Sequence, residues 1–95
     1  MPGYNRAELS AELTIMPSQG AESSPQSQIK AAKETASDSG LAHEAGPETT
    51  VLAGGRSEVL EAVRRVIEAS LDAGAHAVQV RVEAEGDAAR FHEEG

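Results

Sequence analysis

Residues 9–16, LSAELTIM, alternate between positions that suit a core and positions that suit solvent. The first set holds Leu9, Ala11, Leu13 and Ile15, and the second set holds Ser10, Glu12, Thr14 and Met16. A period of two residues is typical of a β-strand with one apolar face. Pro17 follows and predicts the end of the strand, because proline has no backbone N–H for the sheet.

Residues 58–73 have the period of an amphipathic helix instead. Their apolar stripe consists of Val59, Leu60, Val63, Val66, Ile67 and Leu71. Ser57 is the expected N-cap, Glu61 and Arg65 are spaced as an i,i+4 ion pair, and Gly74 is expected to end the helix.

A second, more polar helix is predicted over residues 25–39. Ser24 suits the N-cap, Pro25 suits the first helical position and Gly40 suits the end of the helix. The apolar face of this helix consists only of Ile29, Ala32 and Ala36. Because alanine buries little area, a mobile polar linker is the alternative interpretation.

Three further strands are predicted. LAHEAGPETTVLA reads as a hairpin with strands over 41–45 and 49–53 and a turn over 46–48. AVQVRVE, residues 77–83, alternates again and forms the last strand.

The order strand, helix, strand, strand, helix, strand predicts a ferredoxin-like α+β sandwich, in which a four-stranded antiparallel sheet carries both helices on one face. We expect one domain over residues 9–84, a disordered lead-in over 1–8 and a flexible polar tail over 85–95. The sheet residues predicted to meet the helices are Leu13, Ile15, Val51 or Leu52, Val78, Val80 and Val82. The opposite face would stay open, with Glu12, Thr14, Met16, Gln79 and Arg81 on its first and last strands.

The composition of the chain excludes several classes of partner and of chemistry. The chain of 95 residues has 16 acidic and 8 basic residues and a formal net charge of −8, which argues against nucleic acid and anionic membranes as partners. It has no cysteine, which excludes a disulfide scaffold and a thiolate nucleophile. The start of the chain has no apolar stretch of signal-peptide length, and no run approaches a membrane span, so a cytoplasmic protein is expected.

The junction Gly54-Gly55-Arg56-Ser57 resembles the start of a phosphate-binding loop, yet it matches neither glycine-rich phosphate motif. We interpret it as a turn with a helix cap. Ser57 lacks the last glycine of a nucleophile elbow and has no histidine placed to serve it, so catalysis is not expected.

His43, His76 and His92 lack the spacing of metal ligands, and no metal site is expected. His43 lies on a predicted strand and is a candidate ligand contact. Glu12 is the carboxylate in the middle of a well-formed strand. It could bind a cationic ligand or pair with Arg81, and the alternative is a salt-bridged glutamate at a subunit interface.

Three stretches in this order resemble the thiamine-binding protein family, the YkoF-like proteins: AELTIMP at 11–17, GPETTVLAG at 46–54 and EVLEAVRRVIEASLDAGA at 58–75. The resemblance implies a ferredoxin-like subunit that forms a homodimer or homotetramer through its sheet faces. It also implies binding of thiamine or its hydroxymethylpyrimidine without catalysis, and no other cofactor.

By position in the resemblance, Glu12 and Thr50 are the first candidates for ligand contacts, and Thr14 and His43 are weaker ones. The competing interpretation is a structural or regulatory homo-oligomer without a small ligand. It arises because the predicted strands contain no aromatic residue that could stack on a pyrimidine ring.

Overall fold

The computed structural model describes residues 8–20, 22–44 and 46–84 of the chain. The predicted disordered lead-in, apart from Glu8, and the predicted polar tail over 85–95 lie outside the described residues. So does Ala45, the last residue of one predicted strand.

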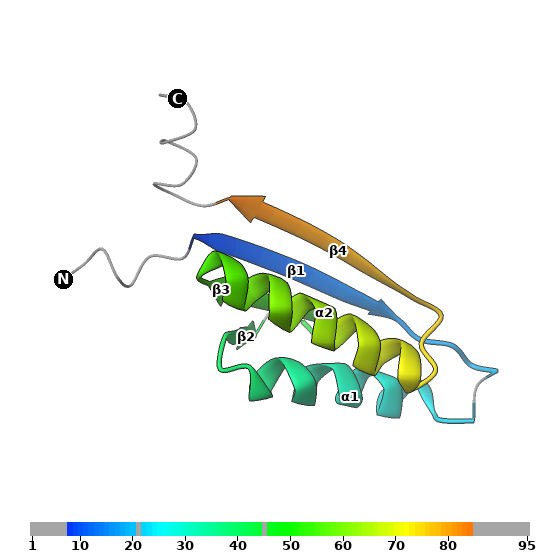
Figure 1. The fold of residues 1–95 in the computed structure, drawn as a ribbon. Helices are drawn as coiled ribbons and strands as arrows, with labels where there is room; N and C mark the ends of the chain where they lie inside the picture. The colour runs from blue at the N-terminus through cyan, green and yellow to red at the C-terminus, as the bar shows by residue number, and fades with distance from the viewer. Residues whose placement is uncertain (1–7, 21, 45, 85–95) are drawn as a thin grey trace.

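The elements follow the predicted order: β1 (Leu9–Met16), α1 (Pro25–Asp38), β2 (Ala42–Glu44), β3 (Thr49–Gly54), α2 (Arg56–Asp72) and β4 (Ala77–Ala84). The strands form one antiparallel sheet in the order β2-β3-β1-β4. Both helices lie side by side over the same face of this sheet (Figure 1). The predicted ferredoxin-like α+β fold is confirmed.

Strand β1 forms the centre of the core. It pairs with β3 on one side and with β4 on the other, so both of its edges are hydrogen-bonded. Ala11, Leu13 and Ile15 are 0%, 0% and 1% exposed beneath the helices. The core cluster to which they belong also includes Leu52 of β3 and, on the helices, Ala32, Ala36, Val59, Ala62, Val63 and Val66.

Helix α1 forms as predicted, and the linker alternative is wrong. The Ser24 side chain accepts a hydrogen bond from the Ser27 N–H at 3.1 Å, and Pro25 occupies the first turn. Gln28 is fully buried, and its amide exchanges hydrogen bonds with the Ser18 backbone at 2.8 and 2.9 Å. Alanine side chains are small enough to let this helix lie close to the sheet. The Gln28 amide supplies hydrogen-bond partners for the buried backbone N–H and C=O of Ser18, which an apolar side chain at position 28 could not do.

The start of α2 differs from the prediction. Gly55, not Ser57, is the N-cap, and no side chain of the cap residue bonds to the helix. The Arg56 N–H donates to the Glu8 carboxylate at 2.9 Å instead. A carboxylate from the lead-in therefore occupies the position at which an anion would meet the helix N-terminus, as the helix dipole favours.

The expected burial of β4 was only partly correct. Val78 packs against the core, but Val80 and Val82 are 37% and 43% exposed. Their side chains share the helix-covered side of the sheet with Leu13 and Ala11, which lie opposite them on β1. Because β4 is an edge strand, two helices placed over the centre of the sheet do not reach far enough to cover it (Figure 1).

Lys33 joins α1 to the β2–β3 hairpin. Its ammonium donates to the carbonyl oxygens of Gly46 at 2.8 Å and Thr49 at 2.7 Å, and it lies 3.5 Å from the Thr50 hydroxyl. Hydrogen bonds that involve a charged group stabilise more than neutral ones. Lys33 thereby adds a polar connection between the hairpin and α1 to the apolar packing of Leu52 in the core.

Replacing Lys33 with methionine tests this connection. We expect Lys33→Met to lower the free energy of unfolding by about 1–3 kcal/mol, because two carbonyls lose a charged donor. Lys30→Met is the matched control. Lys30 lies on the same helix with its side chain 75% exposed and makes only a 3.9 Å pair with Glu34, so its loss should cost about 0.5 kcal/mol or less. Equal losses in urea denaturation of the two variants would contradict the assignment.

Candidate functional site

The face of the sheet that no helix covers is the first candidate surface. Glu12 and Thr14 of β1 lie on it, because the buried residues of that strand alternate with them. The strand register places Arg81 of β4 opposite Glu12 and Gln79 opposite Thr14. A carboxylate, a hydroxyl, an amide and a guanidinium are therefore gathered on two neighbouring strands.

Two shallow hollows lie on this open face, and Glu12 borders both. One has a volume of about 430 Å³ and is lined by Glu12, Thr14, Gln79, Val80 and Arg81. The other has a volume of about 240 Å³ and is lined by Ser10, Glu12, Val51, Arg81 and Glu83. Ligand pockets in proteins are commonly concave, have volumes of about 300–1,000 Å³ and enclose most of the ligand. The open face of one copy of the chain would contact a ligand from one side only.

The Glu12 carboxylate has no ion pair or hydrogen bond with any part of the chain that the structure describes. The pairing with Arg81 that the sequence left open is not formed. Arg81 turns along its own strand and bonds the Glu83 carboxylate at 2.7 Å. Glu12 is thus a carboxylate in the middle of the sheet that no described residue pairs with.

Thr14 and His43 lie on the same open face. The Thr14 hydroxyl is 3.3 Å from the Thr49 hydroxyl on β3. His43 of β2 is opposite Val51, which in turn is opposite Glu12. His43 and Glu12 therefore belong to one row across the sheet, two strand spacings or about 10 Å apart, with Val51 between them.

Thr50 lies on the other side of the sheet. It is 4% exposed, pairs with the core residue Leu13 and contacts the Lys33 ammonium. The four predicted contacts consequently do not form one cluster: Glu12, Thr14 and His43 share the open face, and Thr50 faces the helices. The neighbours of Thr50 in the strand, Thr49 and Val51, lie on the open face instead. The sequence could not show which of the two adjacent threonines, Thr49 or Thr50, faces the helices, because both residues suit a β-strand equally well.

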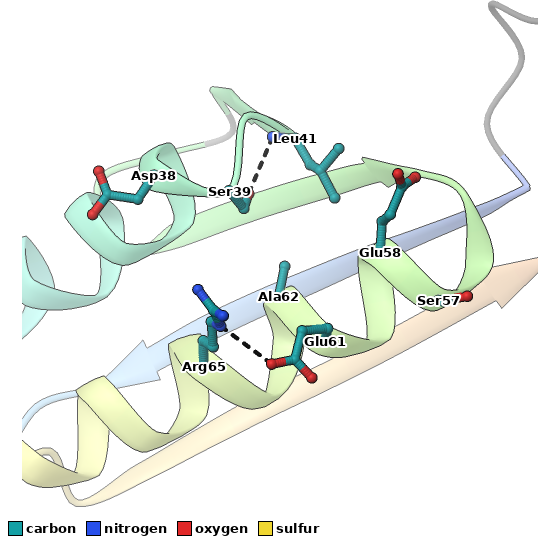
Figure 2. Close-up of a pocket in the computed structure, with 8 residues that line it drawn as sticks. All are labelled: Asp38, Ser39, Leu41, Ser57, Glu58, Glu61, Ala62 and Arg65. Atoms are coloured by element: carbon teal, nitrogen blue, oxygen red, sulfur yellow. Dashed lines mark hydrogen bonds and ion pairs between the residues drawn. The ribbon is translucent and has the colours of Figure 1, made fainter.

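A second candidate surface is a groove between the end of α1 and the start of α2 (Figure 2). Its volume is about 410 Å³. The residues that line it are Asp38, Ser39, Leu41, Ser57, Glu58, Glu61, Ala62 and Arg65. Leu41 and Ala62 give it an apolar floor, and the carboxylates give it an acidic rim. Ser57 lies here among acids, and no histidine is part of the lining.

Glu61 is held on this rim by Arg64 and Arg65 of the same helix. Its carboxylate bonds Arg64 at 2.7 Å and Arg65 at 3.2 Å, and Arg64 also bonds Glu68 at 2.9 Å. The hydrogen bond from Arg64, followed by that from Arg65, lowers the pKa of Glu61 below its ordinary value. The predicted Glu61–Arg65 pair is confirmed, and Arg64 and Arg65 form an exposed, paired face.

The pKa of Glu61 provides a test. A carboxyl group with a lowered folded pKa contributes stability that is present above its unfolded pKa and is lost as pH falls through the folded pKa. We expect the Glu61 carboxyl to titrate below a model-peptide glutamate in an NMR titration. Arg64→Gln should raise that midpoint more than Arg65→Gln, because Arg64 supplies the larger part of the shift. A larger rise in Arg65→Gln would contradict the assignment.

Within residues 8–20, 22–44 and 46–84, no group of three or more histidine, aspartate or glutamate side chains is placed to hold a metal ion. No helix in the described part of the chain is long and apolar enough to cross a membrane.

The fold and the open sheet define a small α+β domain of the ferredoxin-like class. The family model of the thiamine-binding proteins matches residues 11–90, and the chain belongs to this family. Among solved structures it is similar to a domain of unknown function, DUF77, from Bacillus cereus, with 25% sequence identity and a TM-score of 0.65. That match covers 87% of this chain and 79% of the other. No curated protein matches.

Proposed function

We propose that this protein binds thiamine, or its hydroxymethylpyrimidine, on the open face of the sheet and performs no reaction on it. The observation that carries the proposal is the Glu12 carboxylate, which lies on β1, one of the two central strands, borders both hollows and lacks a partner in the described chain. Membership of the thiamine-binding protein family supports a small-molecule ligand.

The chemistry of the open face supports a cationic, hydrogen-bonding ligand. Glu12 can balance the thiazolium charge or accept a hydrogen bond from the aminopyrimidine, since a carboxylate is an acceptor with two oxygens. Thr14 and Gln79, which are opposite each other, add a hydroxyl and an amide that can donate or accept. Arg81 borders the same hollow, and its ion pair with Glu83 offsets the repulsion that its positive charge would exert on a cation.

Both hollows are shallow, so binding to one subunit alone would leave the ligand largely in water. A second copy laid over the open face would cover the ligand from the other side and strengthen the electrostatic attraction to Glu12 by excluding water. We therefore propose that the ligand-binding form is a homo-oligomer assembled through its sheet faces.

The alternative function is a structural or regulatory homo-oligomer without a small ligand. The observation that favours it is the absence of any aromatic side chain from the described strands, since Tyr4 and Phe91 lie outside the described residues. Flat rings are commonly bound by stacking on aromatic side chains. In this alternative, Glu12 would contribute to the contact between subunits.

Isothermal titration calorimetry separates the two functions. We expect thiamine to bind the full chain, and Glu12→Gln to weaken binding by about 10-fold to 100-fold because a charged acceptor is lost. Glu34→Gln is the matched control, since Glu34 lies on an exposed face of α1 and should leave the affinity unchanged.

Titration with hydroxymethylpyrimidine, which lacks the thiazolium, shows which half of the ligand Glu12 recognises. An effect of Glu12→Gln on thiamine alone assigns Glu12 to the thiazolium. The absence of heat at millimolar concentrations of both ligands, from a folded protein, would refute the proposed function. A change in oligomer stability but not in affinity on Glu12→Gln would support the structural alternative.

A further inference from the structure

Arg81 lies directly opposite Glu12 in the sheet, yet its ion pair is with Glu83 of its own strand. Directly opposite residues on antiparallel strands have Cβ atoms about 4.5–5.5 Å apart. Residues two positions apart on one strand are separated by about 7 Å, because each residue advances the strand by about 3.4 Å. Glu12 is therefore the carboxylate whose backbone lies closer to Arg81, although the guanidinium bonds Glu83 at 2.7 Å.

The two carboxylates compete for this one guanidinium. Arg81 and Glu83 share one side of β4 because they are two positions apart, and both border the hollow of about 240 Å³ together with Glu12. The side chain of Arg81 is 74% exposed and that of Glu83 is 48% exposed, so little packing holds either in place. A long and exposed arginine side chain can reach either carboxylate.

Arg81 is the basic side chain that decides the charge around Glu12. The other lysines and arginines in the described part of the chain belong to the helices: Lys30, Lys33, Arg56, Arg64 and Arg65. Both helices cover the opposite face of the sheet (Figure 1). Whether Glu12 carries an unbalanced negative charge consequently depends on the partner that Arg81 takes.

We infer that Glu83 is a positioning residue for the ligand-binding site: by holding Arg81, it keeps the Glu12 carboxylate available for a cationic ligand. Glu83 acts through Arg81 in this role and does not have to touch the ligand. The inference rests on the proposed function, because it concerns the same carboxylate and the same open face.

The charges on the open face explain why the third residue matters. Glu12, Arg81 and Glu83 together carry one net negative charge, and the ion pair on β4 leaves that charge on Glu12. Without the Glu83 carboxylate, one guanidinium and one carboxylate remain on neighbouring strands and balance each other. A cation would then have to displace Arg81 from Glu12 before it could bind there.

Replacing Glu83 with glutamine tests this role in the full chain, by isothermal titration calorimetry with thiamine. We expect Glu83→Gln to weaken thiamine binding by about 3-fold to 10-fold, because Arg81 would compete for Glu12 through an exposed ion pair of modest strength. Adding Arg81→Gln to Glu83→Gln should restore the affinity to at least that of the wild type, since the competitor is then absent.

Glu68→Gln is the matched control. It also removes a carboxylate from an exposed ion pair, the one with Arg64 at 2.9 Å, but it does so on α2, on the other side of the sheet. Its affinity should stay within about 2-fold of the wild type because solvent and salt screen distant charges. A Glu83→Gln variant that binds as tightly as the wild type would overturn the inference. So would a weakened variant that Arg81→Gln does not restore, because Glu83 would then contact the ligand itself or serve only folding.

A measurement without ligand separates this inference from the proposed function. In urea denaturation, Glu12→Gln and Arg81→Gln should have additive effects on stability while Glu83 is present, because the two residues do not pair. In the Glu83→Gln background, their effects should couple by about 1.5-fold to 5-fold in the unfolding equilibrium constant, as for an exposed ion pair. Additivity in both backgrounds would overturn the role of Glu83. Coupling as expected, in a wild type that binds neither thiamine nor hydroxymethylpyrimidine, would refute the proposed function and still show that Glu83 holds Arg81 away from Glu12.

Discussion

The structure depends on the strict alternation of β1, a central strand that is hydrogen-bonded to β3 on one edge and to β4 on the other. Ala11, Leu13 and Ile15 are buried beneath the helices, and this commits every intervening residue to the open face. A slip of one residue would exchange the two faces and expose the core, so the register of β1 is energetically fixed. The faces of β3 and β4 follow from their pairing with it.

This constraint gives the molecule two sides with different properties. The helix side holds the packed core, the Lys33 connection to the hairpin and the buried Thr50. The open side holds Glu12 without a partner among the described residues, beside an arginine that is already paired with Glu83. The Glu12 carboxylate is suited to binding a cation, because it would not have to break an existing ion pair or hydrogen bond in order to do so.

Most of the fold could be predicted from the sequence. The alternation of residues 9–16 and 77–83, the stripe of α2 and the Ser24-Pro25 start of α1 indicated their elements directly. The cap of α2 could not be predicted, because Glu8 reaches it from a residue distant in sequence. The exposure of Val80 and Val82 was also missed, since alternation shows which face a side chain takes but not whether a helix extends over it.

For the candidate site, the sequence by itself determined that Glu12 and Thr14 share the face opposite the core, because a period of two leaves no other choice. Only the tertiary structure decided that Thr50 lies on the helix side, that His43 and Glu12 belong to one row and that Arg81 bonds Glu83 rather than Glu12. These facts depend on strand register and on competition between partners, which arise from pairing across the sheet and have no local signal along the chain.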